Sequence, residues 1–181
     1  MSNYLIPLMV VVPMLCAILV NAFAKFNKSI KVLTFVVAIC LPIIPLLSNY
    51  GLHFFGGYTP MLDNATGVIY HPAITYAFDM LQQIFIAAVG LITFLVAFIY
   101  LSKYKKASGQ YLFLLFMGTA SVTALMLTDD IFNMFVFFEI LALVQVGIVI
   151  ASPMDYSYEM ALKYMILGSI GSPIMLLGIG F

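Results

Sequence analysis

Long stretches without any charged side chain dominate this chain and set its fold class. These stretches cover residues 1–24, 32–62, 80–102, 107–128 and 164–181. A helix needs roughly 20 apolar residues to cross a hydrocarbon core about 30 Å thick, whereas a barrel strand would alternate apolar and polar positions. One further apolar stretch contains a single acid. Together they predict six transmembrane helices, over residues 4–24, 30–48, 79–102, 110–128, 131–151 and 159–181.

The composition agrees with this pattern. The 181 residues are 65% hydrophobic and 8% charged, whereas a soluble domain has about 25% charged residues. We therefore expect an all-α, multi-pass integral membrane protein of the cell membrane or of an energy-transducing inner membrane. The sequence contains no basic patch or nucleic-acid-binding motif, so we expect no nucleic-acid partner.

The lysines predict the orientation of the helices. Six of the seven basic residues flank two connections between predicted helices, and these are Lys25, Lys28, Lys31, Lys103, Lys105 and Lys106. Because connections rich in lysine stay in the cytoplasm, the N-terminus and the connection over residues 49–78 are expected outside. No basic segment precedes the first apolar stretch, so we expect the first helix to be retained rather than cleaved as a signal peptide.

The long connection over residues 49–78 is the one extended polar segment. Its glycines and prolines and Asp63 are turn-forming residues, which predicts a folded, hairpin-like cover over the outer ends of the helices. His53 and His71 allow a metal or proton-entry role, but no further ligand pattern accompanies them, so ordinary loop packing is favoured. Cys16 and Cys40 lie within predicted helices, where inert packing is favoured over redox chemistry. We expect no metal and no cofactor.

Glu139 is the candidate functional residue. It lies eight residues into the fifth predicted helix, which places it about 12 Å deep at 1.5 Å per residue. Insertion of a carboxylate at that depth costs roughly 2.5–3.5 kcal/mol of free energy, so an acid there indicates a functional site. Asp129, Asp130 and Asn133 precede it, and capping of the helix start is favoured over a role as a proton antenna.

Lys163 is the second candidate, about 6 Å into the sixth predicted helix from the inner side. The two charged groups differ in depth by roughly 12 Å, which their side chains and one water molecule can bridge. Burial favours the neutral form of a carboxyl group or an amine, and a nearby opposite charge favours the ionised form. A pair that forms and breaks therefore switches proton affinity, as ion transport requires. The alternatives are a static ion pair, a permanently neutral Glu139, and a Lys163 that extends to the membrane interface.

Two segments make the chain resemble a known family. They are Leu127-Thr-Asp-Asp-Ile-Phe-Asn-Met-Phe-Val-Phe-Phe-Glu139-Ile-Leu and Ala161-Leu-Lys163-Tyr-Met-Ile-Leu-Gly-Ser-Ile-Gly-Ser. They resemble the antiporter-like subunits of Mrp-type sodium/proton antiporters, of respiratory NADH:quinone oxidoreductase and of energy-converting membrane-bound hydrogenases. Gly56-Gly57-Tyr58 and Asp79 also fit this family.

The resemblance implies that Glu139 is the family's helix-five glutamate, which partners a lysine in the ion path. Lys163 is similar to a lysine at the start of helix six in some members. Members usually have fourteen helices and a further key lysine on helix seven, so residues 1–181 resemble the N-terminal part of such a protein, as a single membrane domain.

The favoured function is that of a proton- or sodium-translocating subunit with an intramembrane Glu139/Lys163 pair. Its partners would be the lipid bilayer, H⁺ or Na⁺ and the other membrane subunits of a redox-linked or Mrp-type complex, and it would carry no redox chemistry itself. The alternative is a non-conducting structural subunit that packs against a conducting neighbour. A small-molecule transporter half is disfavoured, because few polar residues other than Glu139 and Gln145 lie within the predicted helices.

Overall fold

Six long helices account for most of the protein in a computed structural model. It describes residues 5–23, 27–49, 51–55, 58–63, 67–72, 74–104, 108–151 and 156–181. The helices of this part of the chain are α1 (Leu5–Ala22), α2 (Asn27–Leu47), α3 (Met80–Lys103), α4 (Gly109–Leu127), α5 (Ile131–Ile150) and α6 (Ser157–Gly180). All six are long and apolar enough to span a membrane. The prediction of an all-α membrane protein with six spanning helices is confirmed.

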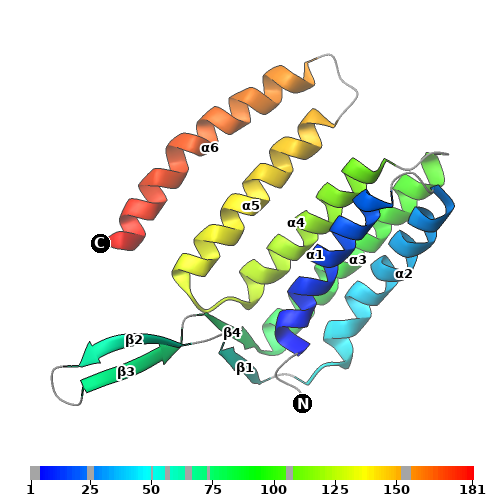
Figure 1. Ribbon diagram of the computed structural model, residues 1–181. Helices are drawn as coiled ribbons and strands as arrows, with labels where there is room; N and C mark the ends of the chain where they lie inside the picture. The colour runs from blue at the N-terminus through cyan, green and yellow to red at the C-terminus, as the bar shows by residue number, and fades with distance from the viewer. Residues whose placement is uncertain are drawn as a thin grey trace.

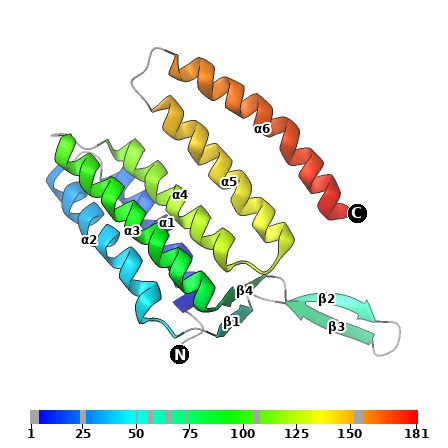
Figure 2. The same ribbon diagram turned by 180° about the vertical axis from the view of Figure 1, so that it is seen from behind.

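The helices form a bundle with an extension on one side (Figures 1 and 2). Helices α1 to α4 pack together, α5 packs on α4, and α6 packs on α5. Lys31 and Lys103 mark one end of the bundle, which we call the lysine end. The opposite end carries the strands, and we call it the strand end. Because α6 lies beyond α5, most of its surface has no contact with the rest of the described chain.

Two apolar clusters hold the four-helix bundle together. The cluster near the strand end contains the fully buried Ile6 and Phe78. The cluster toward the lysine end contains Phe116 and Leu112, also fully buried, and Cys16. The packing role expected for Cys16 is therefore confirmed. Cys40 differs, because it lies on the exposed side of α2, and both cysteines are free.

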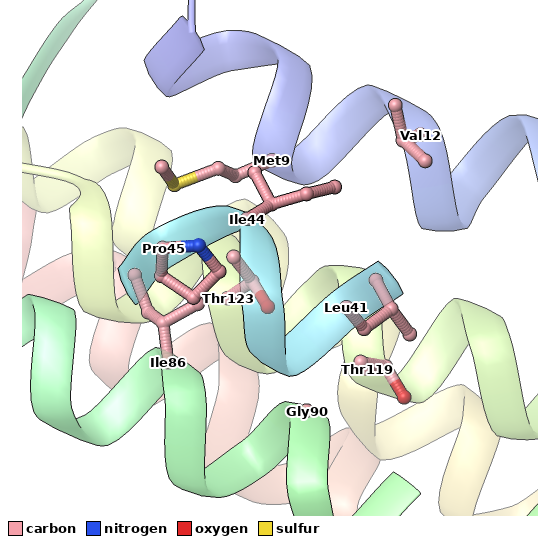
Figure 3. A pocket seen from close by; sticks show the side chains of 9 residues that line it. All are labelled: Met9, Val12, Leu41, Ile44, Pro45, Ile86, Gly90, Thr119 and Thr123. Carbon is pink, nitrogen blue, oxygen red and sulfur yellow. The ribbon is translucent and has the colours of Figure 1, made fainter. Parts of the chain in front are cut away.

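Helices α2 and α3 approach most closely at Gly90. A Cβ atom on Gly90 would lie 2.7 Å from the backbone nitrogen of Pro42, so no larger residue fits without a backbone shift. Beside this contact is a cavity of about 10 Å³, enough for about one water molecule, lined by residues of α1 to α4 (Figure 3). Thr119 and Thr123 supply its hydroxyl groups, and Glu139 is not among its lining residues.

The long connection forms two antiparallel strand pairs, as its turn-rich sequence predicts. Strands β1 (Leu52–Phe55) and β4 (Thr75–Phe78) pair with each other, and β2 (Tyr58–Asp63) pairs with β3 (Gly67–Pro72). The β1–β4 pair lies against the helices, whereas the β2–β3 hairpin projects sideways from it (Figure 1). Only the first pair therefore acts as the cover expected from the sequence.

Candidate functional site

The start of α5 is fixed by its capping residue. The carboxylate of Asp130 accepts hydrogen bonds from the backbone N–H groups of Phe132 and Asn133, at 3.3 and 3.0 Å. These N–H groups have no partner within the helix, and a negative charge at this end complements the helix dipole. The Asn133 amide donates to Thr128 Oγ1 at 2.9 Å, which adds a link to the preceding turn. The predicted capping of α5 is confirmed for Asp130.

The strand pair β1–β4 supports the same turn. The backbone N–H of Asp129 donates to the carbonyl oxygen of Thr75 at 3.0 Å, and Tyr76 forms a β-bridge with Thr128. The Asn133 amide also reaches the Tyr76 hydroxyl at 3.4 Å. These bonds fix the position of α5 along its axis relative to the bundle, and therefore the depth of Glu139.

Glu139 lies near the middle of α5. It is eight residues from Ile131 in a helix of 20 residues, or about 12 Å from the end of a helix about 30 Å long. Its side chain is half-buried, on the side of α5 that faces α6. The sequence predicted a depth of about 12 Å for this acid, and the helix bounds agree.

The partner of Glu139 is Ser172 of α6. The Ser172 hydroxyl donates a hydrogen bond to Glu139 Oε1 and also lies 3.1 Å from the carbonyl oxygen of Gly168. Sequence reasoning did not identify Ser172 as a partner of Glu139. A signal for it was present. Glu139 is eight residues after the start of α5 and Ser172 is eight residues before the end of the antiparallel α6, so the two lie at equal depth.

A hydroxyl group suits a carboxyl group that changes its protonation state. When Glu139 is ionised, the Ser172 hydroxyl donates to it, as in this structure. When Glu139 is neutral, its proton can be donated to Ser172 Oγ, while the Ser172 hydroxyl donates to the carbonyl of Gly168. The same three groups therefore satisfy both states without a movement of either helix.

Lys163 pairs with Glu159 and not with Glu139. Its Nζ atom lies 2.6 Å from Oε1 of Glu159, one turn earlier in α6. Both side chains are mostly uncovered by the rest of the chain, at 64% and 59% exposure. Lys163 is therefore paired locally, within α6.

The position of Lys163 on α6 explains why it does not meet Glu139. It precedes Ser172 by nine residues, which corresponds to about 13 Å along the axis and two and a half turns. Lys163 thus projects from the face of α6 opposite to the one that carries Ser172. The structure brings Glu139 and Ser172 together, and it does not bring Glu139 and Lys163 together.

The remaining candidate ligands do not form a metal site in the described part of the chain. No group of three or more His, Cys, Asp or Glu side chains converges there. His53 is exposed on β1. The side chain of His71, and therefore any role for it, lies outside the described residues.

Comparisons with known proteins find relatives that match nearly the whole chain. No protein-family model matches the chain. An uncharacterized protein of Methanocaldococcus jannaschii is 38% identical over 179 residues, which cover 99% of this chain and 36% of the relative. One of the Na(+)/H(+) antiporter subunits of Alkalihalophilus pseudofirmus is 22% identical, with the same coverage of both chains.

A solved structure has the same fold. One chain of the membrane-bound sulfane sulfur reductase, an archaeal respiratory membrane complex, superimposes with a TM-score of 0.76 at 23% identity, over 96% of this chain and 36% of that chain. The present chain thus spans about a third of the length of the proteins it matches. With the motifs around Glu139 and Lys163, these matches confirm that the chain resembles the N-terminal part of the antiporter-like subunit family.

Proposed function

We propose that this chain supplies part of the ion path of a proton- or sodium-translocating antiporter-like subunit, with Glu139 as the group that takes up and releases the ion. The observation that carries the proposal is the Glu139–Ser172 hydrogen bond near the middle of two membrane-spanning helices. A carboxyl group at that depth is costly, and a partner that serves both its protonation states suits repeated proton uptake and release.

In this proposal Lys163 does not pair with Glu139 directly. It projects from the free face of α6, where its ammonium group is held by Glu159. If Lys163 left Glu159 and paired with an acid on another helix, the charge distribution at the helices that cover this face would change. The direct lysine partner of Glu139 then comes from another element, because Lys163 lies on the opposite side of α6.

The protein would act within a multisubunit redox-linked or Mrp-type complex in the cell membrane or an energy-transducing inner membrane. The wide uncovered surface of α6 supports this part of the proposal. Leu162, Ile166 and Ile170 are each at least half exposed there, which suits contact with further apolar helices or lipid.

Replacement of Glu139 tests the proposal in the complete complex. Glu139→Gln keeps the volume and the hydrogen-bonding capacity of the side chain but cannot take up a proton. We expect normal assembly and a loss of at least about 90% of ion uptake into vesicles, since a general acid or base typically contributes 10²–10⁴-fold. Glu139→Asp should keep part of the activity, because it retains the acid with a shorter reach.

A purely structural role is the second candidate, and the large surface of α6 that the other described residues leave uncovered favours it, because such a surface can pack against a neighbouring subunit. In that case Glu139→Gln would leave ion uptake unchanged in a fully assembled complex. Loss of assembly in Glu139→Gln, with activity following the amount of complex, would likewise favour the structural role.

A further inference from the structure

A groove opens between α3, α4 and α5 at the lysine end. Its volume is about 690 Å³. The polar side chains that line it are Tyr100, Lys103, Tyr104, Ser108, Gln110 and Tyr111. Lysine and tyrosine at the end of a membrane-spanning helix lie at the level of the lipid headgroups. Among the described residues that line this groove, none is acidic and Lys103 alone carries a charge.

The three tyrosines form a rigid wall. The rings of Tyr100 and Tyr111 stack with their centroids 4.3 Å apart, and Tyr104 lies 4.9 Å from Tyr100. The Tyr100 hydroxyl accepts a hydrogen bond from the backbone N–H of Ser108 at 2.9 Å, which joins the end of α3 to the start of α4. The three tyrosines are thus held in place by contacts within the chain, and they line the same groove as Lys103.

A second, apolar groove lies next to the first, closer to the middle of the membrane. Its volume is about 230 Å³, and it lies over α4 between α3 and α5. Ile148 of α5 lines both grooves, so the two grooves adjoin at this residue. Val89 lines the end nearer the middle of the membrane, and Lys103 lines the end at the membrane interface. The two residues are 14 positions apart on α3, which corresponds to about 21 Å. Half of a hydrocarbon core plus its headgroup layer measures about 20 Å.

We propose that this combined groove binds one anionic phospholipid, with the phosphate beside Lys103 and an acyl chain along α4. The cation and the hydroxyl groups at the membrane interface match the charged headgroup of such a lipid. The apolar groove matches its acyl chain, and the total length matches one leaflet. The lipid fills the space between α3 and α5 and so supports the position of α5 on the bundle. This inference stands independently of the function proposed for Glu139.

Photo-crosslinking in the complete complex tests the lipid site. The probe is phosphatidylglycerol with a photoreactive diazirine in its acyl chain, added to the purified complex and mapped by mass spectrometry of the labelled peptides. We expect adducts on α4 and α5 residues of the groove. Excess unlabelled phosphatidylglycerol should remove them, whereas phosphatidylcholine and inorganic phosphate should not.

Two variants and a matched control make the test specific. Lys103→Gln should reduce the groove adducts about fivefold, the effect of one basic residue near an anionic lipid. Ile148→Trp fills the junction of the two grooves and should abolish the adducts without a change of charge. Lys163→Gln removes the same charge from α6, outside the groove, and should leave them unchanged.

Three outcomes would overturn the proposal. One is equal labelling of the groove by phosphatidylcholine, which would mean that the headgroup is not recognised. Another is unchanged labelling in both groove variants. The third is an absence of groove adducts in the assembled complex, which would show that a protein partner covers this surface.

Discussion

Ser172 gives Glu139 a partner that can both donate and accept a hydrogen bond. The hydroxyl lies within hydrogen-bonding reach of the carboxylate and of the Gly168 carbonyl, so it can turn from one to the other as the carboxyl group gains a proton. A lysine in the same place would hold Glu139 ionised, and an apolar residue would hold it neutral. The hydroxyl can pair with either protonation state of a carboxyl group, which suits the role proposed for Glu139.

Removal of this hydroxyl should impair transport without loss of the fold. A hydrogen bond to a charged group contributes about 1.5–3 kcal/mol, so we expect Ser172→Ala to slow ion uptake by about tenfold and to change its pH profile. Ser169→Ala is the matched control, because the Ser169 hydroxyl donates to the Ile166 carbonyl within α6 and does not reach Glu139. Equal effects of the two variants on ion uptake would mean that the Ser172 hydroxyl stabilises α6 and does not act on Glu139.

At the scale of elements, close contact of α2 and α3 depends on one residue without a side chain. Gly90 lies against the backbone of Leu41 and Pro42. Nearby, the side-chain amide of Gln83 donates to the carbonyl oxygens of Pro45 and Ser48, at 2.9 and 3.2 Å. These carbonyls lie at the end of α2, where few backbone donors remain, and the Pro45 carbonyl also accepts from the backbone N–H of Ser48 at 3.2 Å. The amide therefore adds a donor at this end and links the two helices.

A methyl group at Gly90 should loosen this contact. Because its nearest neighbours are backbone atoms, which cannot rotate away, we expect Gly90→Ala to destabilise the bundle by about 1–3 kcal/mol. The measurement is the thermal unfolding of the purified complex, with Ala88→Leu on the exposed side of α3 as the control. An unchanged midpoint in Gly90→Ala would mean that α2 and α3 lie farther apart than in this structure.

The elements were predictable from the sequence because charge and apolar length mark membrane spans directly. Every predicted span overlaps its helix, and the ends differ by at most three residues, as at Asn27. The pairing of side chains was less predictable. Lys163 was placed near Glu139 by depth alone, whereas the rotation of α6 about its axis decides which residue faces α5. That rotation depends on packing, which no single stretch of sequence specifies.

At the scale of the whole molecule, the helix ends next to the two lysine-flanked connections lie at one end and the strands at the other (Figure 1). This arrangement supports the proposed orientation, in which the lysine end faces the cytoplasm and the strand end faces outward. In that orientation Glu139 is about 12 Å from the outer ends of the helices.

Cysteine labelling tests the orientation. A cysteine introduced at Ser108, at the lysine end, should react with a membrane-impermeant reagent only from the cytoplasmic side. One introduced at Asn64, in the long connection, should react only from outside. The two native cysteines are replaced by serine beforehand. Reversed labelling would invert the proposed orientation and the direction from which ions reach Glu139.

The central claim is that Glu139 gains and loses a proton during ion translocation. Infrared difference spectroscopy of the complex in vesicles measures this directly, because a protonated carboxyl group has its own C=O stretching band. On reversal of the ion gradient, the wild-type complex should show a reversible carboxyl band that Glu139→Gln lacks and that Ser172→Ala shifts in frequency. A band of equal size in Glu139→Gln, or its absence from an actively transporting wild-type complex, would contradict the account.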